Sequence, residues 1–284
     1  MALISGIPGP RPIVLPKTLR LLRRLPFPHK LGIAERFFGR GLAQHGVCWA
    51  KTAAGPVWKL DLANCTHRWM LYGDYEGPAL WNWLRRRTER VDTIVDSGAN
   101  IGQTVLSFSA LLPRARIIAY EPGTEARAWL SASVEANAFE HVSIQPFGLG
   151  SRPSDAFLAQ QGDAKHLRGS WNRVSSSEGE PIRITTLDAE MIRLGLNSID
   201  IWKLDVEGFE LEALRGAEKA LLNHAVRAIY LETTGDGKDP SLTYLREHNY
   251  TIHAITDSGR LSEWKPRGSL GYVLCLPNSS SSQS

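Results

Sequence analysis

A strand, a glycine turn and a helix follow one another between residues 91 and 112, and this unit constrains the fold more than any other stretch. Val91 to Val95 contains the β-branched side chains of a buried strand, and residues 103–112 space apolar side chains as a helix does. The turn between them is Asp96-Ser97-Gly98-Ala99-Asn100-Ile101-Gly102. Glycines there let a ligand approach the backbone, and the N–H groups of the following helix favour an anion. The pattern therefore predicts a ligand-binding turn at the carboxyl end of a strand.

The spacing of the glycines indicates which ligands the turn can bind. The turn has the pattern D-x-G-x-x-x-G, which differs from the dinucleotide fingerprint G-x-G-x-x-G and from the phosphate loop. Nicotinamide-dependent oxidoreductases are therefore disfavoured. The next predicted strand, 116–120, ends at Glu121, whose carboxylate can accept hydrogen bonds from both hydroxyls of a ribose. S-adenosylmethionine has a ribose and an amino-acid end but no pyrophosphate, so we expect it as the cofactor.

Two glycines alone could simply tighten a turn, but acids at the ends of two neighbouring strands favour a cofactor site. We expect Asp96 to hold the ammonium group of the cofactor, directly or through water, and Glu121 to bind its ribose. The predicted cofactor-binding residues are Asp96, Ser97, Gly98, Asn100, Gly102 and Glu121.

Strands and helices alternate along most of the chain after residue 90. This alternation predicts an α/β, Rossmann-like fold, with a mostly parallel seven-stranded sheet and helices on both faces. Residues 250–255 and 271–276 are expected to form an antiparallel pair at the sheet edge. Residues 150–181, rich in Ser, Gly, Asp and Gln, interrupt the alternation and are expected to form a lid or a substrate loop. The other predicted strands are 91–96, 116–120, 141–147, 199–204 and 228–231.

The chain divides into four predicted segments. Residues 1–46 form a basic N-terminal arm with short helices, and residues 47–90 form a cap made of a β-hairpin and helices. Residues 91–277 form the Rossmann-like domain. Residues 278–284 are a polar tail that we expect to be disordered.

Charge is uneven along the chain, although the formal net charge is only +4. The first 45 residues contain eight Lys or Arg and a single acid, Glu35. Such a segment is either a solvated helix face or a peripheral contact with an anionic membrane. The body has no face that combines basic and aromatic residues, so nucleic acid is not expected as a partner.

Cysteine usage and hydropathy bear on the compartment. The three cysteines have no C-x-x-C spacing, so neither a disulfide framework nor a zinc cluster is predicted. No apolar run reaches the ~18 residues of a membrane-spanning helix. Residues 1–16 contain too many prolines for a convincing signal peptide. We therefore expect a cytoplasmic protein.

A second group of polar residues follows the strand 199–204. Lys203, Asp205 and Glu207 alternate there, and Glu232 ends the next predicted strand. In open α/β sheets ligands bind beyond the carboxyl ends of the strands, so these side chains are expected near Glu121. The simpler interpretation is an ion pair that caps the following helix. Asp205 with Glu232 could hold Mg²⁺, but no D-x-D spacing supports a metal and none is predicted.

These motifs together resemble the FkbM family of S-adenosylmethionine-dependent methyltransferases over roughly residues 47–275. The resemblance implies a class I methyltransferase fold and methylation of a hydroxyl on a sugar, polyketide or similar small molecule. Ser97 departs from the family pattern, where glycine or valine is usual. The matching pieces are Gly73-Asp74-Tyr75-Glu76, Val95 to Gly102, Tyr120-Glu121-Pro122, Thr186-Leu187-Asp188 and Lys203 to Glu210.

Methyl transfer to a hydroxyl requires alignment of the acceptor oxygen and removal of its proton. Asp205 or Glu207 is the predicted general base, tuned by Lys203, with Glu232 and His253 as further candidates. A methyltransferase with a nitrogen acceptor and a non-catalytic module that keeps the fold are the alternatives. The identity of the acceptor and the oligomeric state stay open at this point.

Overall fold

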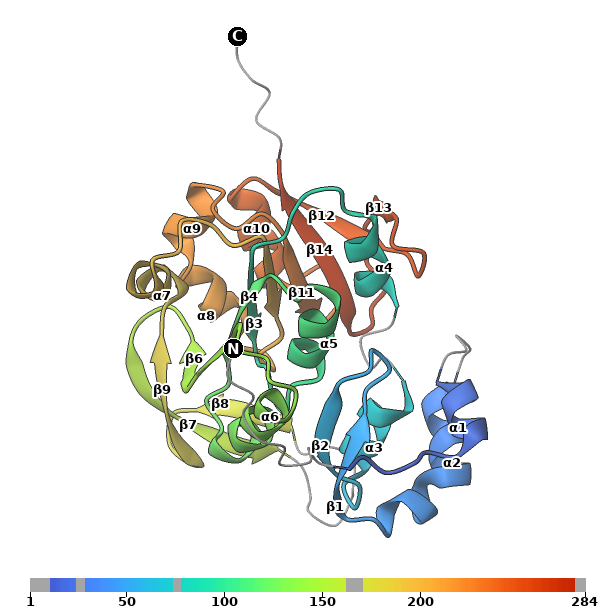
Figure 1. The fold of residues 1–284 in the computed structure, drawn as a ribbon. Helices are drawn as coiled ribbons and strands as arrows, with labels where there is room; N and C mark the ends of the chain where they lie inside the picture. The colour runs from blue at the N-terminus through green and yellow to red at the C-terminus, as the bar shows by residue number, and fades with distance from the viewer. Residues whose placement is uncertain (1–10, 24–28, 74–77, 162–170, 279–284) are drawn as a thin grey trace, which may run out of the picture.

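A computed structural model describes residues 11–23, 29–73, 78–161 and 171–278 of the chain. Its centre is a large sheet that the described residues build from eight strands in the order β13-β12-β14-β11-β10-β3-β4-β5 (Figure 1). The strands are β3 (Thr93–Ser97), β4 (Arg116–Tyr120), β5 (Val142–Gln145), β10 (Ile201–Leu204), β11 (Ile229–Thr233), β12 (Tyr250–Ile255), β13 (Leu261–Glu263) and β14 (Gly271–Pro277).

The order of the strands makes the fold a class I methyltransferase fold. The chain passes outward from β3 through β4 to β5, then returns to β10 on the other side of β3, and these strands and β11 are parallel. The last strand, β14, inserts antiparallel between β11 and β12, which confirms the predicted antiparallel pair. The short strand β13 adds an edge that was not expected. Strand order reverses between β3 and β10, where open sheets bind ligands.

Helices cover both faces of the sheet because successive strand residues point to opposite sides. Val95 and Trp202 pack with α7–α10, whereas Ile94 and Ile201 pack with α4–α6. The helices are α4 (Ala79–Arg86), α5 (Gln103–Leu111), α6 (Thr124–Ala136), α7 (Leu187–Leu194), α8 (Glu210–Arg215), α9 (Glu218–Leu222) and α10 (Pro240–Glu247).

The segment 150–181 differs from the expected irregular loop. Its described part forms strands of a second sheet in the order β6-β9-β7-β8. Strand β7 pairs antiparallel with both of its neighbours, β8 and β9. The polar composition of β7 and β8 shows little of the alternation that marks a half-buried strand, whereas β9 alternates the buried Ile182 and Ile184 with more exposed residues. The predicted strand 141–147 also divides, since β5 stays in the large sheet and β6 joins the second one. Bounds are β6 (Phe147–Leu149), β7 (Ser154–Gln161), β8 (Trp171–Ser175) and β9 (Glu180–Thr185).

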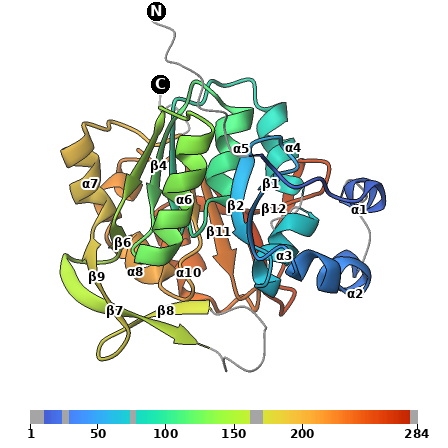
Figure 2. The same ribbon diagram turned by 60° about the horizontal axis from the view of Figure 1, so that its bottom comes forward.

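The N-terminal part forms a lobe from α1 (Lys17–Leu22), α2 (Lys30–Ala43), the hairpin β1 (Val47–Lys51)–β2 (Val57–Asp61) and α3 (Cys65–Tyr72). Its β2 strand lies against α6 (Figure 2), where Ser133 Oγ accepts a hydrogen bond from Lys59 N at 3.1 Å. Trp58 Nε1 donates to Ile101 O at 2.8 Å, so the lobe supports the Gly98–Gly102 turn.

Parts of four predicted features fall outside the described residues: 1–10 and 24–28 of the N-terminal arm, 74–76 of the resemblance motif, 162–170 of the expected loop, and the tail from residue 279 onward. Within the described ranges, no helix combines the length and the apolar character needed to cross a bilayer.

Candidate functional site

A cavity of about 940 Å³ opens at the carboxyl ends of β3, β4 and β10, beside the reversal of strand order. The large sheet contributes its floor, the second sheet one wall, and α3 and α6 another. Of the predicted site residues, the cavity is lined by Ser97, Gly98, Asn100, Glu121, Lys203, Asp205 and Glu207.

The Gly98 turn is fixed by close backbone packing. Gly98 has φ +77°, and a Cβ atom there would lie 1.8 Å from the carbonyl oxygen of Asp205. The N–H groups of Gly98 and Ala99 both donate to Tyr120 O at 3.1 Å. Only glycine fits this conformation and this contact, so bare backbone faces the cavity beside β4 and β10.

The Glu121 side chain is buried, and backbone N–H groups donate hydrogen bonds to both of its carboxylate oxygens. Its Oε2 accepts the N–H of Asn100 and its Oε1 the N–H of Gly123, both at 2.8 Å. Burial raises its pKa to about 7, against the opposing effect of these two hydrogen bonds. Each carboxylate oxygen has a second lone pair, so the group retains acceptor capacity toward a ligand in the cavity.

Lys203 is a buried cation held between two carboxylates. Its Nζ lies 3.5 Å from Asp96 Oδ1 and 3.2 Å from Asp205 Oδ2. Asp96 pairs with Lys203 in the register of β3 and β10, and it also accepts a hydrogen bond from the Thr104 hydroxyl. Burial raises the pKa of Asp96, and the Lys203 charge opposes that rise. Asp96 is fully buried and is not among the residues that line the cavity.

Asp205 has a second partner that the sequence did not suggest. Tyr272 Oη donates to Asp205 Oδ2 at 2.8 Å. Tyr272 comes from β14, where it pairs in register with Glu232, and its ring stacks on Tyr230 with 4.7 Å between centroids. The antiparallel insertion of β14 therefore places a phenol beside the carboxylates at the ends of β10 and β11.

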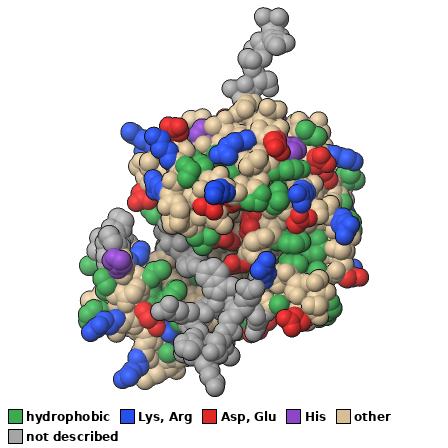
Figure 3. All heavy atoms as spheres, turned by 180° about the vertical axis from the view of Figure 1, so that it is seen from behind, with side chains coloured by type: hydrophobic (Ala, Val, Ile, Leu, Met, Phe, Trp, Pro, Cys, Tyr) green, Lys and Arg blue, Asp and Glu red, His purple; other side chains and the backbone are tan. Residues whose placement is uncertain are grey.

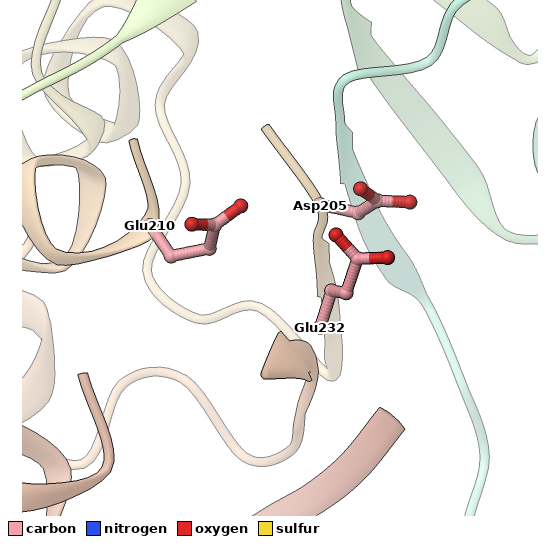
Figure 4. A group of neighbouring side chains, drawn as sticks. All are labelled: Asp205, Glu210 and Glu232. Atoms are coloured by element: carbon pink, nitrogen blue, oxygen red, sulfur yellow. The ribbon is translucent and has the colours of Figure 1, made fainter. Parts of the chain in front are cut away.

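Three carboxylates, those of Asp205, Glu210 and Glu232, lie close to one another at the ends of β10 and β11 and the start of α8 (Figure 4). Oxygen atoms of Asp205, Glu210 and Glu232 lie within 4.8 Å of one another, a grouping that can share a proton or hold a cation. Part of the acceptor capacity of Glu210 is used within the protein, because its Oε1 accepts hydrogen bonds from the N–H groups of Val206 and Gly208. Burial, followed by the charges of Asp205 and Glu207, raises the pKa of Glu232 to about 9. Glu232 therefore holds a proton at neutral pH.

Glu207, two residues after Asp205, is not one of these three carboxylates, and it lines the cavity. Burial raises its pKa to about 7, followed by repulsion from Asp205 and Glu210, while Lys203 opposes the rise. Its backbone has φ +56° and is followed by Gly208 at φ +90°. A left-handed non-glycine residue is uncommon and occurs preferentially in turns at functional sites.

Glu232→Gln should raise the melting temperature at pH 8, by about 2–4 °C for each kcal/mol of unfavourable charge burial that it removes. The folded pKa of Glu232 lies above the ordinary glutamate value of 4.5, so its effect on stability becomes more unfavourable as pH rises from about 4.5 to about 9. Glutamine keeps the volume and a donor toward Asp205 without the charge. Thermal unfolding at pH 5 and pH 8 measures the effect, which should vanish at pH 5. A variant less stable than the wild type at pH 8 would contradict this assignment.

The other predicted residues lie away from the cavity. Gly102 has φ +95° and begins α5, where it fits against Leu130. His253 lies within β12 opposite Glu263 and does not line the cavity. Conversely, His67 and Trp129 line the cavity with an edge-to-face contact of 5.6 Å between ring centroids, and neither is among the predicted catalytic or cofactor-binding residues.

The model of the methyltransferase FkbM domain matches residues 96–252, more than half of the chain. The protein belongs to the FkbM methyltransferase family. Residues 96–252 therefore form an S-adenosylmethionine-dependent methyltransferase domain.

Three curated proteins are similar to this FkbM domain protein at modest identity. The AMB antimetabolite synthetase AmbE of Pseudomonas aeruginosa is 27% identical over 58% of this chain and 10% of its own length. Methyltransferase sdnD of Sordaria araneosa is 30% identical over 49% of this chain and 65% of its own length. The 2-O-methyltransferase NoeI of Sinorhizobium fredii is 29% identical over 64% of this chain and 77% of its own length. The chain thus spans a small part of AmbE and about two thirds of sdnD.

Among solved structures, precorrin-6y C5,15-methyltransferase from Geobacter metallireducens aligns with 70% of this chain and 87% of its own, at 12% identity and a TM-score of 0.42.

Proposed function

We propose that this protein transfers the methyl group of S-adenosylmethionine to a hydroxyl of a small molecule or glycan. The observation that carries the proposal is Glu207, a carboxylate with a pKa of about 7 that faces the cavity. A base with this pKa suits removal of a hydroxyl proton at neutral pH. The similarity to the 2-O-methyltransferase NoeI supports an oxygen acceptor.

The cavity fits the cofactor that the family uses. The backbone of the Gly98 turn lines the cavity where the methionine end is proposed to lie, and Glu121 retains lone pairs for two ribose hydroxyls. Asn100 and Ser97 line the same space. The bound cofactor supplies an electrophilic methyl group on a sulfonium. Asp96 is enclosed by Lys203 and Thr104, so we propose that it positions Lys203 instead of contacting the ammonium group of the cofactor directly.

The acceptor hydroxyl is proposed to meet Glu207 at the β10 end of the cavity. Glu207 would accept the hydroxyl proton as the oxygen takes the methyl group in line. The bond between that methyl group and sulfur breaks, S-adenosylhomocysteine is left, and the proton stays on the Glu207 carboxylate. Asp205 is fixed by Lys203 and Tyr272, so it acts as a rigid acceptor that orients the hydroxyl. Lys203 balances the negative charge of Asp205 and limits the pKa of Glu207.

Glu121→Gln should weaken the binding of S-adenosylhomocysteine about 10- to 100-fold, because a hydrogen bond to a charged acceptor contributes ~1.5–3 kcal/mol. Titration calorimetry measures the dissociation constant. Glu140→Gln, an exposed site outside the cavity, is the matched control and should bind as the wild type does. Equal affinity in Glu121→Gln and wild type would exclude Glu121 as the ribose acceptor.

The acceptor class is tested with labelled S-adenosylmethionine and a panel of saccharides. Each saccharide with a free 2-hydroxyl is paired with its 2-deoxy analogue, so that the only difference is the proposed acceptor oxygen. Label should appear in a hydroxylated member of the panel and be lost in its deoxy partner. Equal labelling of a saccharide and its 2-deoxy analogue would show that the methyl group is transferred to a position other than the 2-hydroxyl. Labelling of amines alone would reject an oxygen acceptor.

A further inference from the structure

Large exposed apolar side chains gather in the N-terminal lobe. Val14 is 88% exposed and Phe37 is 74% exposed. Elsewhere in the described ranges such side chains are dispersed over the body, at Ile192, Leu222, Leu261 and Leu270. The large exposed apolar residues of the lobe are Val14, Leu21, Ile33, Phe37 and Val47.

The same part of the lobe is positively charged. Its single acid between residues 11 and 46, Glu35, is bound by Arg68 Nη2 at 2.5 Å and by Tyr72 Oη at 2.7 Å, both from α3. The acid is therefore engaged within the lobe and leaves the outer basic groups unbalanced. The exposed basic residues here are Arg11, Lys17, Arg20, Arg36 and Arg40.

Helix α2 has exposed apolar side chains and exposed basic side chains on the same face. Ile33 and Phe37 are four residues apart, as are Arg36 and Arg40, so all four project from neighbouring positions on the helix. Ala34 and the other buried positions of α2 pack into the lobe on the opposite side. Hydrophobic and basic side chains intermingle at the lower left of Figure 3, where this lobe lies.

We propose that this N-terminal face, formed by Val14, Lys17, Arg20, Leu21, Ile33, Arg36, Phe37 and Arg40, binds an anionic lipid surface. Apolar side chains that project from a basic helix face insert at the headgroup boundary while the basic groups meet lipid phosphates. A second copy of the chain would bring like charges together, which disfavours self-association through this face. Helix α3 packs on α2 and contributes His67 and Met70 to the cavity wall.

Vesicle flotation with the purified full chain tests the proposal. The wild type should float with phosphatidylcholine vesicles containing about 30% phosphatidylglycerol and remain unbound with phosphatidylcholine alone. Arg36→Glu/Arg40→Glu should weaken the partition roughly 30-fold or more, at about fivefold for each lost basic residue. Phe37→Ser should weaken it on the same vesicles while leaving its salt dependence unchanged.

Matched controls separate this face from general surface effects. Arg114→Glu and Leu222→Ser change an exposed basic and an exposed apolar residue of the body and should partition as the wild type does. Thermal unfolding and S-adenosylhomocysteine binding should be unchanged in every variant, since the residues lie outside the cavity. Three results would overturn the proposal: no flotation at low salt, equal binding to neutral vesicles, or face variants that bind like the controls. Concentration-dependent dimerisation abolished by Phe37→Ser, without flotation, would assign the face to a second copy instead.

Discussion

Glu207→Gln should lower kcat by about 10²- to 10⁴-fold, the contribution of a positioned general base. Glutamine keeps the shape of the side chain and cannot accept the hydroxyl proton. The left-handed backbone at Glu207 and its hydrogen-bonded turn do not depend on the carboxylate, so the fold and the affinity for S-adenosylhomocysteine should persist. Initial rates at saturating cofactor, together with calorimetry, separate the two effects.

The pH dependence of kcat/KM tests independently whether Glu207 is the general base. With a pKa of about 7, Glu207 is protonated and inactive below neutrality, so kcat/KM should rise with pH up to about 7 and then level off. Glu207→Gln should lose this inflection, and Glu140→Gln should retain it. An inflection that survives in Glu207→Gln would reject Glu207 as the titrating base and assign the inflection to another buried carboxyl group, such as Glu121.

Lys203→Met should reduce the free energy of unfolding by about 3–5 kcal/mol, the usual cost of leaving a buried charge without its partner. Lys203 is 3% exposed and contacts two carboxylates and the carbonyl oxygen of Gly98. Methionine fills a similar volume with no charge, so Asp96 is left buried without a cation. Denaturant titration at pH 8 measures the loss.

The cost of Lys203→Met should depend on pH in a defined direction. The folded pKa of Asp96 is already raised by burial, and removal of the cation raises it further. The free energy of unfolding of the variant should therefore fall as pH rises above about 3.8, the pKa of Asp96 in the unfolded chain. The difference in free energy of unfolding between variant and wild type should be smaller at pH 5 than at pH 8. Adding Asp96→Asn should recover part of the loss, whereas a midpoint unchanged by Lys203→Met would show that the charge cluster is not coupled to folding.

The parallel part of the sheet was predictable from sequence because its strands are short runs of β-branched and aliphatic residues. Thr93–Ser97 and Ile201–Leu204 bury both faces, and such strands need no alternation to be recognised. Strands β7 and β8 gave no such signal. Their polar residues become strand only through long-range pairing, which composition does not record.

Site residues that lie in a local sequence motif could be predicted. Site residues that reach the cavity only through the arrangement of distant strands and helices could not. Gly98 and Glu121 follow from residues at strand ends, and both line the cavity. Tyr272 lies far along the chain and reaches Asp205 only because β14 inserts beside β11. His67 reaches the cavity through the packing of the N-terminal lobe on α6, and no motif near it indicates that role.

Methyl-¹³C-labelled S-adenosylmethionine gives the most direct test of an oxygen acceptor. The protein is incubated with the labelled cofactor and the saccharide panel, and the carbon chemical shift of the new methyl group identifies the atom to which it is attached. We predict a methoxy resonance that is absent with Glu207→Gln and present with Glu140→Gln. A new resonance at the N-methyl or C-methyl position, with none in the methoxy region, would contradict the account.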